Sequence, residues 1–182
     1  MTFDRILDDG RLWAVRYDGM DDNALTMLFD QWGDVVWLRN FFKENWDDLT
    51  SYFKVTDLNT AIEDTIEDSD QLQCLMLDLS PDSNLDEIFH PLENYRTSEM
   101  LLGREKAKPK RVSRHSSWLR IYAIKIESGI YVITGGAIKL TFTMAERKHT
   151  ADELVKMDKV RRFMLNENII DEDSFLDYVN TL

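Results

Sequence analysis

Three residues with the chemistry to hold a phosphate group stand close together in the C-terminal third of the chain. Arg120 and Tyr122 are two residues apart in an alternating run, and Lys139 lies on the return segment. Residues two apart in a strand point to the same face. A sheet that carries Arg, Lys and Tyr can hold a phosphodiester by charge and stack a base on the ring, as proteins commonly do with single-stranded RNA. Two alternatives stay open: Tyr122 as a half-buried core aromatic and Lys139 as a solvent-facing strand lysine.

More cations follow on a predicted helix that begins near Thr150. Leu154, Met157 and Val160 lie on its apolar side, and its positive residues fall on the opposite side: Lys156, Lys159, Arg161 and Arg162. Taken alone, a basic helix face is usually only a solvated surface. His149 precedes the helix and could titrate near neutral pH, although a surface histidine at a helix entry is the simpler interpretation.

The charge is divided unevenly along the sequence. The net charge is −12, but residues 1–97 carry 7 Lys+Arg and 22 Asp+Glu, whereas residues 98–163 carry 15 and 7, and the remainder has 5 acidic residues and no basic ones. A local positive field attracts polyanions whatever the net charge. The acidic helical segment near residues 55–100 could also cover the basic surface within the same molecule.

Composition and motifs exclude several classes. Hydrophobic residues make up 43% of the 182 residues, which favours a folded domain over global disorder. Cys74 is the only cysteine and the three histidines stand apart, so we expect no metal and no other cofactor. Gly135-Gly136 fits no phosphate-loop spacing. The sequence shows neither an export leader nor a run of about 18 apolar residues, so we expect a cytoplasmic protein with no membrane contact.

Apolar spacing of three and four predicts helices in the middle of the chain. Two helices follow Asp21 and are broken near Gly33 and Asp34, and a longer one begins after Asp57 as its N-cap. The run NLDEIFHPLENY predicts a further short helix before Pro91, and the polar, basic stretch 97–117 predicts a mobile connection.

Alternating residues predict strands on either side of these helices. The first strand lies within 11–17, and the run LRIYAIKIESGIYVITGGAIKLT reads as a hairpin whose turn is Ser128-Gly129. Whether Gly135-Gly136 bends one strand or separates two stays open. A capping box at 150–153 starts the last helix. The order predicts a single α+β domain with a small antiparallel sheet, divided into a strand and helical hairpin (1–54), an acidic helical insertion (55–100), and a basic sheet with the C-terminal helix (101–182).

The C-terminal third, about residues 117–177, resembles the RelE/HigB-type toxins of bacterial toxin–antitoxin pairs. The resemblance rests on SWLRIYAIKIESGIYVITGGAIKLT, a basic loop, HTADEL, and a helix that ends in KVRRFM. It implies a RelE-like α+β fold, metal-independent endoribonuclease activity on mRNA, with or without the ribosome, and an antitoxin partner of helix-turn-helix type. It also implies roles for individual residues: Arg120 and Lys139 hold the phosphate, Tyr122 stacks or transfers a proton, His149 is an acid or base, and Arg147 and Lys148 follow the RNA backbone. The chain is nearly twice the usual toxin length and acidic, so a non-enzymatic protein-binding module on the same fold is the alternative.

Overall fold

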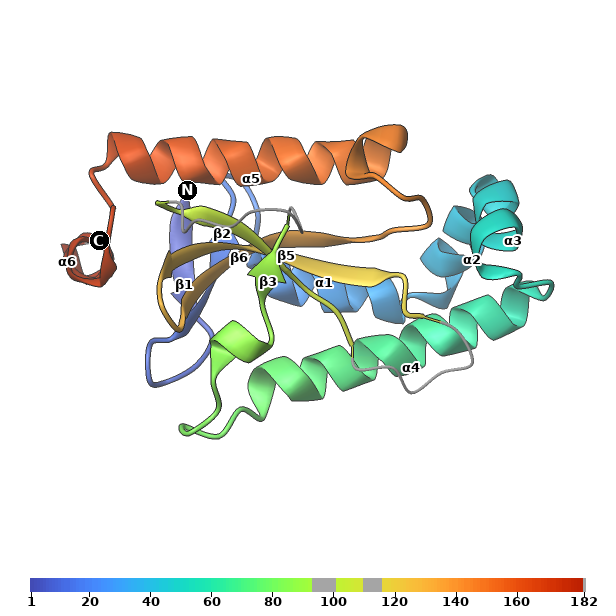
Figure 1. The fold of residues 1–182 in the computed structure, drawn as a ribbon, viewed down its shortest axis with the longest axis horizontal. Coiled ribbons are helices and arrows are strands. Elements are labelled where there is room, and N and C mark those ends of the chain that lie inside the picture. The colour runs from blue at the N-terminus through green and yellow to red at the C-terminus, as the bar shows by residue number, and fades with distance from the viewer. Residues whose placement is uncertain (93–100, 110–115, 182) are drawn as a thin grey trace.

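A computed structural model describes residues 1–92, 101–109 and 116–181. It has an α+β architecture in which one sheet lies between two layers of helices (Figure 1). The elements in chain order are β1 (Thr2–Arg5), β2 (Leu12–Arg16), α1 (Ala24–Gly33), α2 (Val35–Glu44), α3 (Trp46–Phe53), α4 (Leu58–Leu77), η1 (Leu85–Glu87), β3 (His90–Pro91), β4 (Gly103–Ala107), β5 (Leu119–Glu127), β6 (Ile130–Ile138), η2 (Met144–Glu146), α5 (Lys148–Asn166) and α6 (Glu172–Thr181).

The sheet has the strand order β1-β2-β6-β5-β4-β3. The strand predicted within 11–17 is confirmed as β2, and the predicted hairpin is β5–β6, with a single strand running through Gly135 and Gly136. An irregularity in the register between Tyr122 and Ala123 bends this pair. The prediction of a purely antiparallel sheet is wrong at one position, because β2 runs parallel to β6. The helices between β2 and β6 supply the long crossover that a parallel pair requires.

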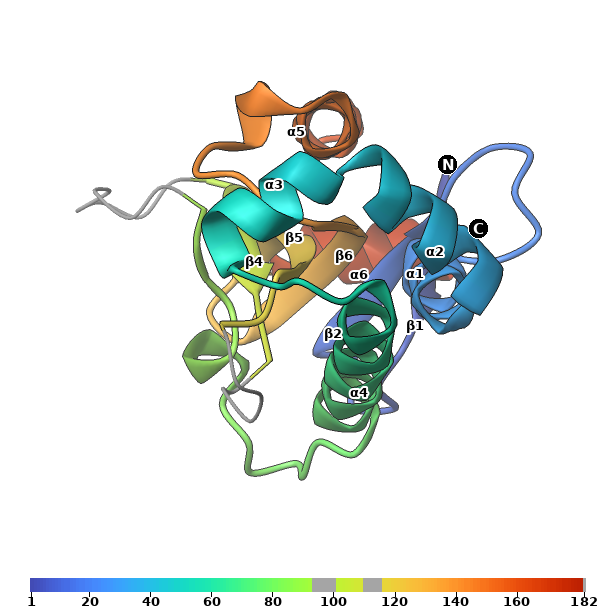
Figure 2. The ribbon, with the colours of Figure 1, turned by 90° about the vertical axis from the view of Figure 1, so that its right-hand side faces the viewer.

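Each face of the sheet has its own apolar core. On one face, α1 and α4 pack with residues such as Leu12, Ile121 and Ile133. On the other face, α5 and α6 pack over Trp13, Tyr122 and Val132, among others. The end-on view separates α5 on one side of the sheet from α4 on the other (Figure 2).

The helices in the middle of the chain begin where local signals place them. Gly33 ends α1, and the Asp34 side chain accepts from the amides of Val36 and Trp37 to start α2. Asp57 caps α4 in the same way. These two starts are confirmed, because an N-cap carboxylate satisfies amides that have no partner inside the helix. The apolar run after Asp34 forms two helices rather than one, since α2 ends before Asn45.

The prediction of a mobile connection across 97–117 is wrong for Gly103–Ala107, which form β4 and pair with β5. Its sequence, GREKA, has no apolar alternation, so strand pairing overrides the local signal. The parts of that prediction at 97–100 and 110–115 lie outside the described residues.

The start of α5 also differs from the prediction. The helix begins at Lys148, and the Thr150 hydroxyl donates to the carbonyls of Met144 and Arg147 instead of capping the helix. The capping box belongs to Thr143 and Glu146, before the start of α5, where it starts η2. The helix α6 and the strand β1 were not predicted.

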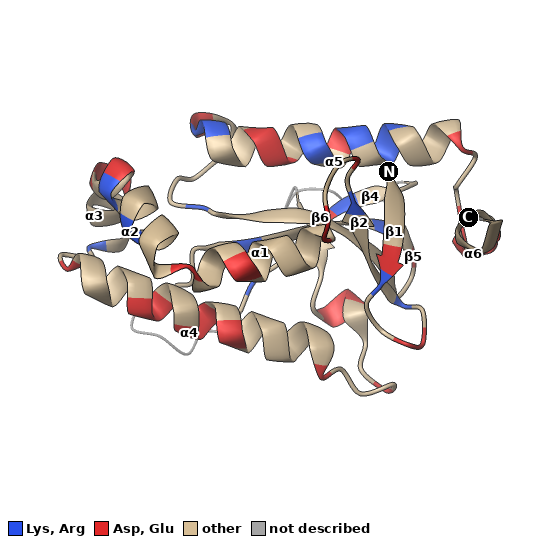
Figure 3. Ribbon diagram, turned by 180° about the vertical axis from the view of Figure 1, so that it is seen from behind, with Lys and Arg blue, Asp and Glu red and all other residues tan. Residues whose placement is uncertain are grey.

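The helix α4 of the acidic segment is part of the core and does not cover the cations of α5. Ala61, Ile62 and Leu72 of α4 are buried against the sheet, and Trp118 Nε1 donates to Thr65 Oγ1 at 2.9 Å. The acidic residues of α4 and the cations of α5 lie on opposite sides of the sheet (Figure 3). The expectation of an intramolecular cover is therefore wrong for α4, and residues 93–100 of the acidic segment lie outside the described residues.

Candidate functional site

Three cations, two from the adjacent strands β4 and β5 and one directly after β6, share the face of the sheet that α5 covers. We call Lys106, Arg120 and Lys139 the cationic cluster. Lys106 is directly opposite Tyr122 across β4 and β5, and Arg120 is two residues before Tyr122. Lys139 follows Ala137, the partner of Arg120, by two residues, and its amide donates to the Trp118 carbonyl. Because side chains alternate along a strand, and Tyr122 and Ala137 both belong to the core under α5, the three cations point to one face.

The charges of the cluster act on one another. Burial lowers the pKa of Lys139, and the charges of Arg120 and Lys106 lower it further. The pKa of Lys106 is lowered by burial and then by Arg120 and Lys108. Burial also lowers the pKa of Arg120. Like charges held close together in a half-buried place favour an anion that would neutralise them.

Backbone carbonyl groups hold the cationic cluster in position. Arg120 Nη1 donates to the carbonyls of Ser117 at 2.8 Å and Leu119 at 2.6 Å. Lys139 Nζ donates to those of Thr141 and Phe142, and Lys106 Nζ to that of Leu92. These carbonyls orient the cations, and the charges of Asp68 and Glu146 act on Arg120 and Lys139, respectively. A phosphate oxygen is a stronger, charged acceptor for the same donors.

The structure brings Tyr122 beside Arg120 but buries it. Its side chain has no exposed surface, and its hydroxyl is buried with no hydrogen-bond partner among the described residues. Burial raises the pKa of the hydroxyl, and the nearby charge of Arg120 opposes that shift. Stacking on a base needs an exposed ring, so this part of the prediction does not fit the position of Tyr122.

His149 has a structural contact on its Nε2 atom. Nε2 lies 2.9 Å from the Ile138 carbonyl, so it donates there when it carries the proton, and the ring packs edge-on against Phe41. The β6 segment that it contacts lies beyond the last residue paired with β2. His149 therefore contacts the Ile138 carbonyl in a part of β6 that is not paired with β2.

The predicted RNA-binding cations are spread along α5 and contact groups of the chain. Arg147 forms a two-pronged ion pair with Asp48, both contacts being 2.6 Å, and Lys148 pairs with Asp152. Lys156 pairs with Glu153, and the Lys159 ammonium lies over the Tyr17 ring. Arg161 donates to the carbonyls of residues 101 and 102, and Arg162 donates to the Asp158 carbonyl. The structure does not bring them together with the cationic cluster as one set.

Among the described residues, no group of three or more His, Cys, Asp or Glu side chains could hold a metal ion. In the same part of the chain, every helix is too short or too polar to cross a membrane.

Two residues of interest escaped the sequence analysis. Lys106 was missed because β4 has no apolar alternation, and only the pairing with β5 places it beside Arg120. Glu153 was interpreted as part of a capping box, yet it is buried in the middle of the molecule. The spacing of three residues between Glu153 and Lys156 in a predicted helix was the signal that could have indicated their ion pair.

Comparison of the chain with family models, curated proteins and solved structures gave no match.

Proposed function

We propose that this protein binds the phosphate backbone of single-stranded RNA at the cationic cluster and acts as a metal-independent endoribonuclease of the RelE/HigB type. The observation that carries the proposal is the convergence of Lys106, Arg120 and Lys139 on one face of β4, β5 and β6. Half-buried cations oriented by backbone carbonyls are suited to a phosphodiester, which brings a full negative charge and several acceptor oxygens.

The proposed chemistry is attack of the ribose 2′-OH on the adjacent phosphorus. Lys139 in its neutral form takes the 2′-OH proton, the new O–P bond forms, the P–O5′ bond breaks, and the Lys106 ammonium gives a proton to the leaving oxygen. Arg120 holds the charge that develops on the non-bridging oxygens. The products are a 2′,3′-cyclic phosphate and a 5′-hydroxyl. Burial and neighbouring positive charges lower the pKa of both lysines, so either one loses its proton more readily than an exposed lysine does.

In this proposal the protein acts on mRNA in the cytoplasm, free or in the ribosome, and a helix-turn-helix antitoxin protein neutralises it. The burial of Tyr122 and the carbonyl contact of His149 favour the second candidate, a non-enzymatic protein-binding module, since neither group is available for catalysis as it stands.

The test is RNA binding and cleavage by the variant Lys106→Met/Lys139→Met. Each lost phosphate contact costs about 1 kcal/mol, so we expect the affinity for single-stranded RNA to fall by about 30-fold. The slope of log K against log salt should become shallower by about 1.4. Fluorescence anisotropy over a salt series measures both quantities, and gel analysis in the presence of EDTA measures cyclic-phosphate products.

The matched control is Arg5→Met/Lys43→Met, which removes the same charge from two exposed positions and should change RNA affinity less than threefold. Expression in bacterial cells gives a second measurement: the wild type arrests growth and degrades mRNA, and the cluster variant does not. A folded wild type that binds no RNA and leaves growth unchanged would reject the ribonuclease and favour the protein-binding module.

A further inference from the structure

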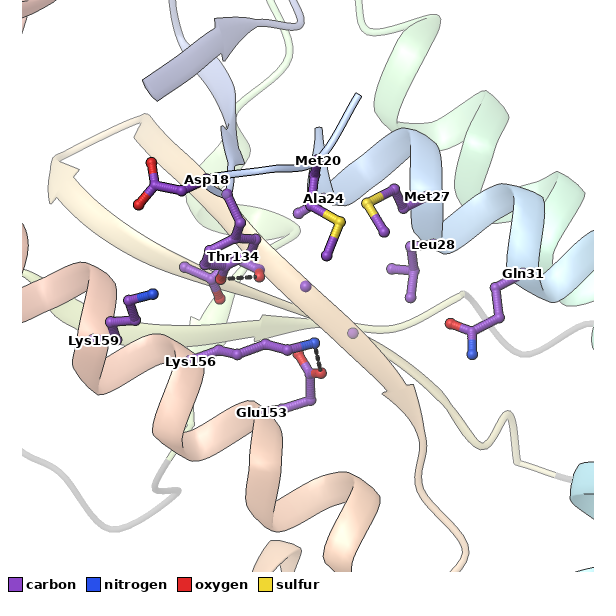
Figure 4. Close-up of a pocket in the computed structure, with 13 residues that line it drawn as sticks. Asp18, Met20, Ala24, Met27, Leu28, Gln31, Thr134, Glu153, Lys156 and Lys159 are labelled. Atoms are coloured by element: carbon purple, nitrogen blue, oxygen red, sulfur yellow. Dashed lines mark hydrogen bonds and ion pairs between the residues drawn. The ribbon is translucent and has the colours of Figure 1, made fainter. Parts of the chain in front are cut away.

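A cavity of about 600 Å³ lies beside β6, between α1 and α5 (Figure 4). The pairing of β2 with β6 ends at Ala14 and Ile133. The next three residues of β6, Thr134, Gly135 and Gly136, have no partner in β2 and line the cavity. Tyr17 closes one end, since its hydroxyl donates to the Thr134 carbonyl at 2.6 Å. This volume is in the range of small-molecule sites and is large enough for a nucleotide.

Glycines keep side chains away from this stretch of β6. A Cβ atom on Gly135 would lie 2.3 Å from Glu153 Oε2, and one on Gly136 would lie 2.5 Å from Leu28 Cδ2 and from the Arg120 carbonyl oxygen. Only glycine lets the Glu153 carboxyl and the strand approach so closely. The Glu153 carboxyl and the Leu28 side chain therefore occupy the space beside these two glycines at the border of the cavity.

Glu153 gives the cavity a buried acceptor. The residue is 5% exposed; its Oε1 pairs with Lys156 at 2.6 Å, and its Oε2 is buried with no hydrogen-bond partner among the described residues. Burial raises its pKa, Lys156 and the Gly136 amide act in the opposite direction, and Asp152 adds to the rise. The Gly136 amide is near the carboxyl, but Oε2 forms no hydrogen bond of normal geometry with the described residues, so a ligand N–H at this place would be favoured.

The rest of the lining is apolar on the α1 side and positive at the α5 side. Met20, Met27 and Leu28 form the apolar wall, and Lys156 and Lys159 stand opposite (Figure 4). Methionine sulfur packs well against the edges of aromatic rings. Lys156 already pairs with Glu153 and Asp18 also lines the cavity, so Lys159 is the lysine that suits a negatively charged group of a ligand. The ligand should therefore be planar, donate N–H groups and carry an anion.

We propose that this cavity binds a guanine base of the RNA, with Glu153 accepting from its Watson–Crick edge and Lys159 contacting its phosphate. Guanine fits because N1–H and the N2 amino group are adjacent donors that match a carboxylate. Adenine and cytosine present an acceptor nitrogen beside the amino group, and uracil has acceptors on both sides of its single N–H. Splayed-out bases are commonly recognised by such edge contacts. The inference rests on the proposed function, to which it adds a base preference.

Calorimetric titration with guanosine, inosine and adenosine monophosphates tests the site. We expect the wild type to bind the guanosine nucleotide at least tenfold more tightly than the adenosine nucleotide, with inosine, which lacks the N2 amino group, between them. Glu153→Gln should abolish this preference while adenosine nucleotide affinity changes less than threefold. Asp152→Asn is the matched control, because Asp152 neighbours Glu153 but pairs with Lys148; it should retain the preference. Thermal unfolding confirms that each variant is folded.

Equal affinity for the three nucleotides, or a guanine preference that survives Glu153→Gln in the folded protein, would overturn the guanine site. The cluster variant Lys106→Met/Lys139→Met separates the two proposals, since it should weaken RNA binding but not nucleotide binding. RNA binding without a guanine preference rejects the base site alone. Nucleotide binding dependent on Glu153, with no RNA binding, rejects the proposed function and leaves a nucleotide pocket.

Discussion

Replacing Gly136 with alanine is expected to lower the free energy of unfolding by about 3 kcal/mol. The new Cβ would lie 2.5 Å from the Arg120 carbonyl oxygen and 2.5 Å from Leu28 Cδ2. Leu28 could shift, but the Arg120 carbonyl belongs to the backbone of β5, the partner strand of β6. Relief of the contact therefore requires the two strands to separate. At about 2–4 °C per kcal/mol for a chain of this size, the melting temperature should fall by about 6–12 °C in circular dichroism melts.

Gly33→Ala is the matched control for this prediction. Gly33 is the last residue of α1, and a Cβ there would have nothing within 4 Å. Alanine is about 1 kcal/mol better than glycine in a helix, so this variant should be neutral or slightly more stable. Leu28→Ala in the Gly136→Ala background should recover only part of the loss, because the backbone contact remains. A Gly136→Ala melting temperature within 2 °C of the wild type would contradict the close approach of β5 and β6.

The parts of the fold that sequence predicts well are those fixed by nearby residues. The caps at Asp34 and Asp57 satisfy amides two or three residues away, so the helix starts can be found locally. The hairpin is equally local, because a turn at Gly129 with φ +78° directly joins its two strands. By contrast, β4 has a polar sequence, and the parallel pairing of β2 with β6 joins segments more than a hundred residues apart.

The candidate site shows the same division. The shared strand face of Arg120 and Tyr122 follows from alternation, and so does the proximity of Lys139 across the hairpin. That Tyr122 has no exposed surface depends on α5, which no local pattern reports. The predicted RNA-binding cations contact partners from distant elements, such as Asp48 for Arg147, or from α5 itself, such as Glu153 for Lys156. Charge patterns predict where cations lie, and tertiary packing decides which ones act together.

The second large effect is expected at Asp86, whose carboxylate ties η1 to the β5–β6 turn. It accepts from Ser128 Oγ at 2.6 Å, from the Gly129 amide at 3.1 Å and from the Tyr131 hydroxyl, and it lies 3.2 Å from Lys125 Nζ. Asp86→Ala removes the acceptor from all four groups, which should cost about 3 kcal/mol in the free energy of unfolding. Urea unfolding followed by fluorescence measures this loss, and Asp82→Ala, an exposed carboxyl in the preceding turn, should change it by less than 0.5 kcal/mol.

The effect of Asp86 should also depend on pH. Burial acts to raise the pKa of Asp86, but the hydrogen bonds from Ser128, Tyr131, Gly129 and Lys125 outweigh it and hold the pKa well below its ordinary value of 3.8. A lowered pKa means that the folded state binds the proton less readily than the unfolded state. The stabilisation is then fully present above pH 3.8 and is lost as the pH falls toward the folded-state pKa. The difference in unfolding free energy between the wild type and Asp86→Asn should accordingly be constant from pH 7 to pH 5 and shrink below pH 4. If this difference does not change down to pH 3, the negative charge of Asp86 does not contribute to the free energy of unfolding, and the prediction is wrong.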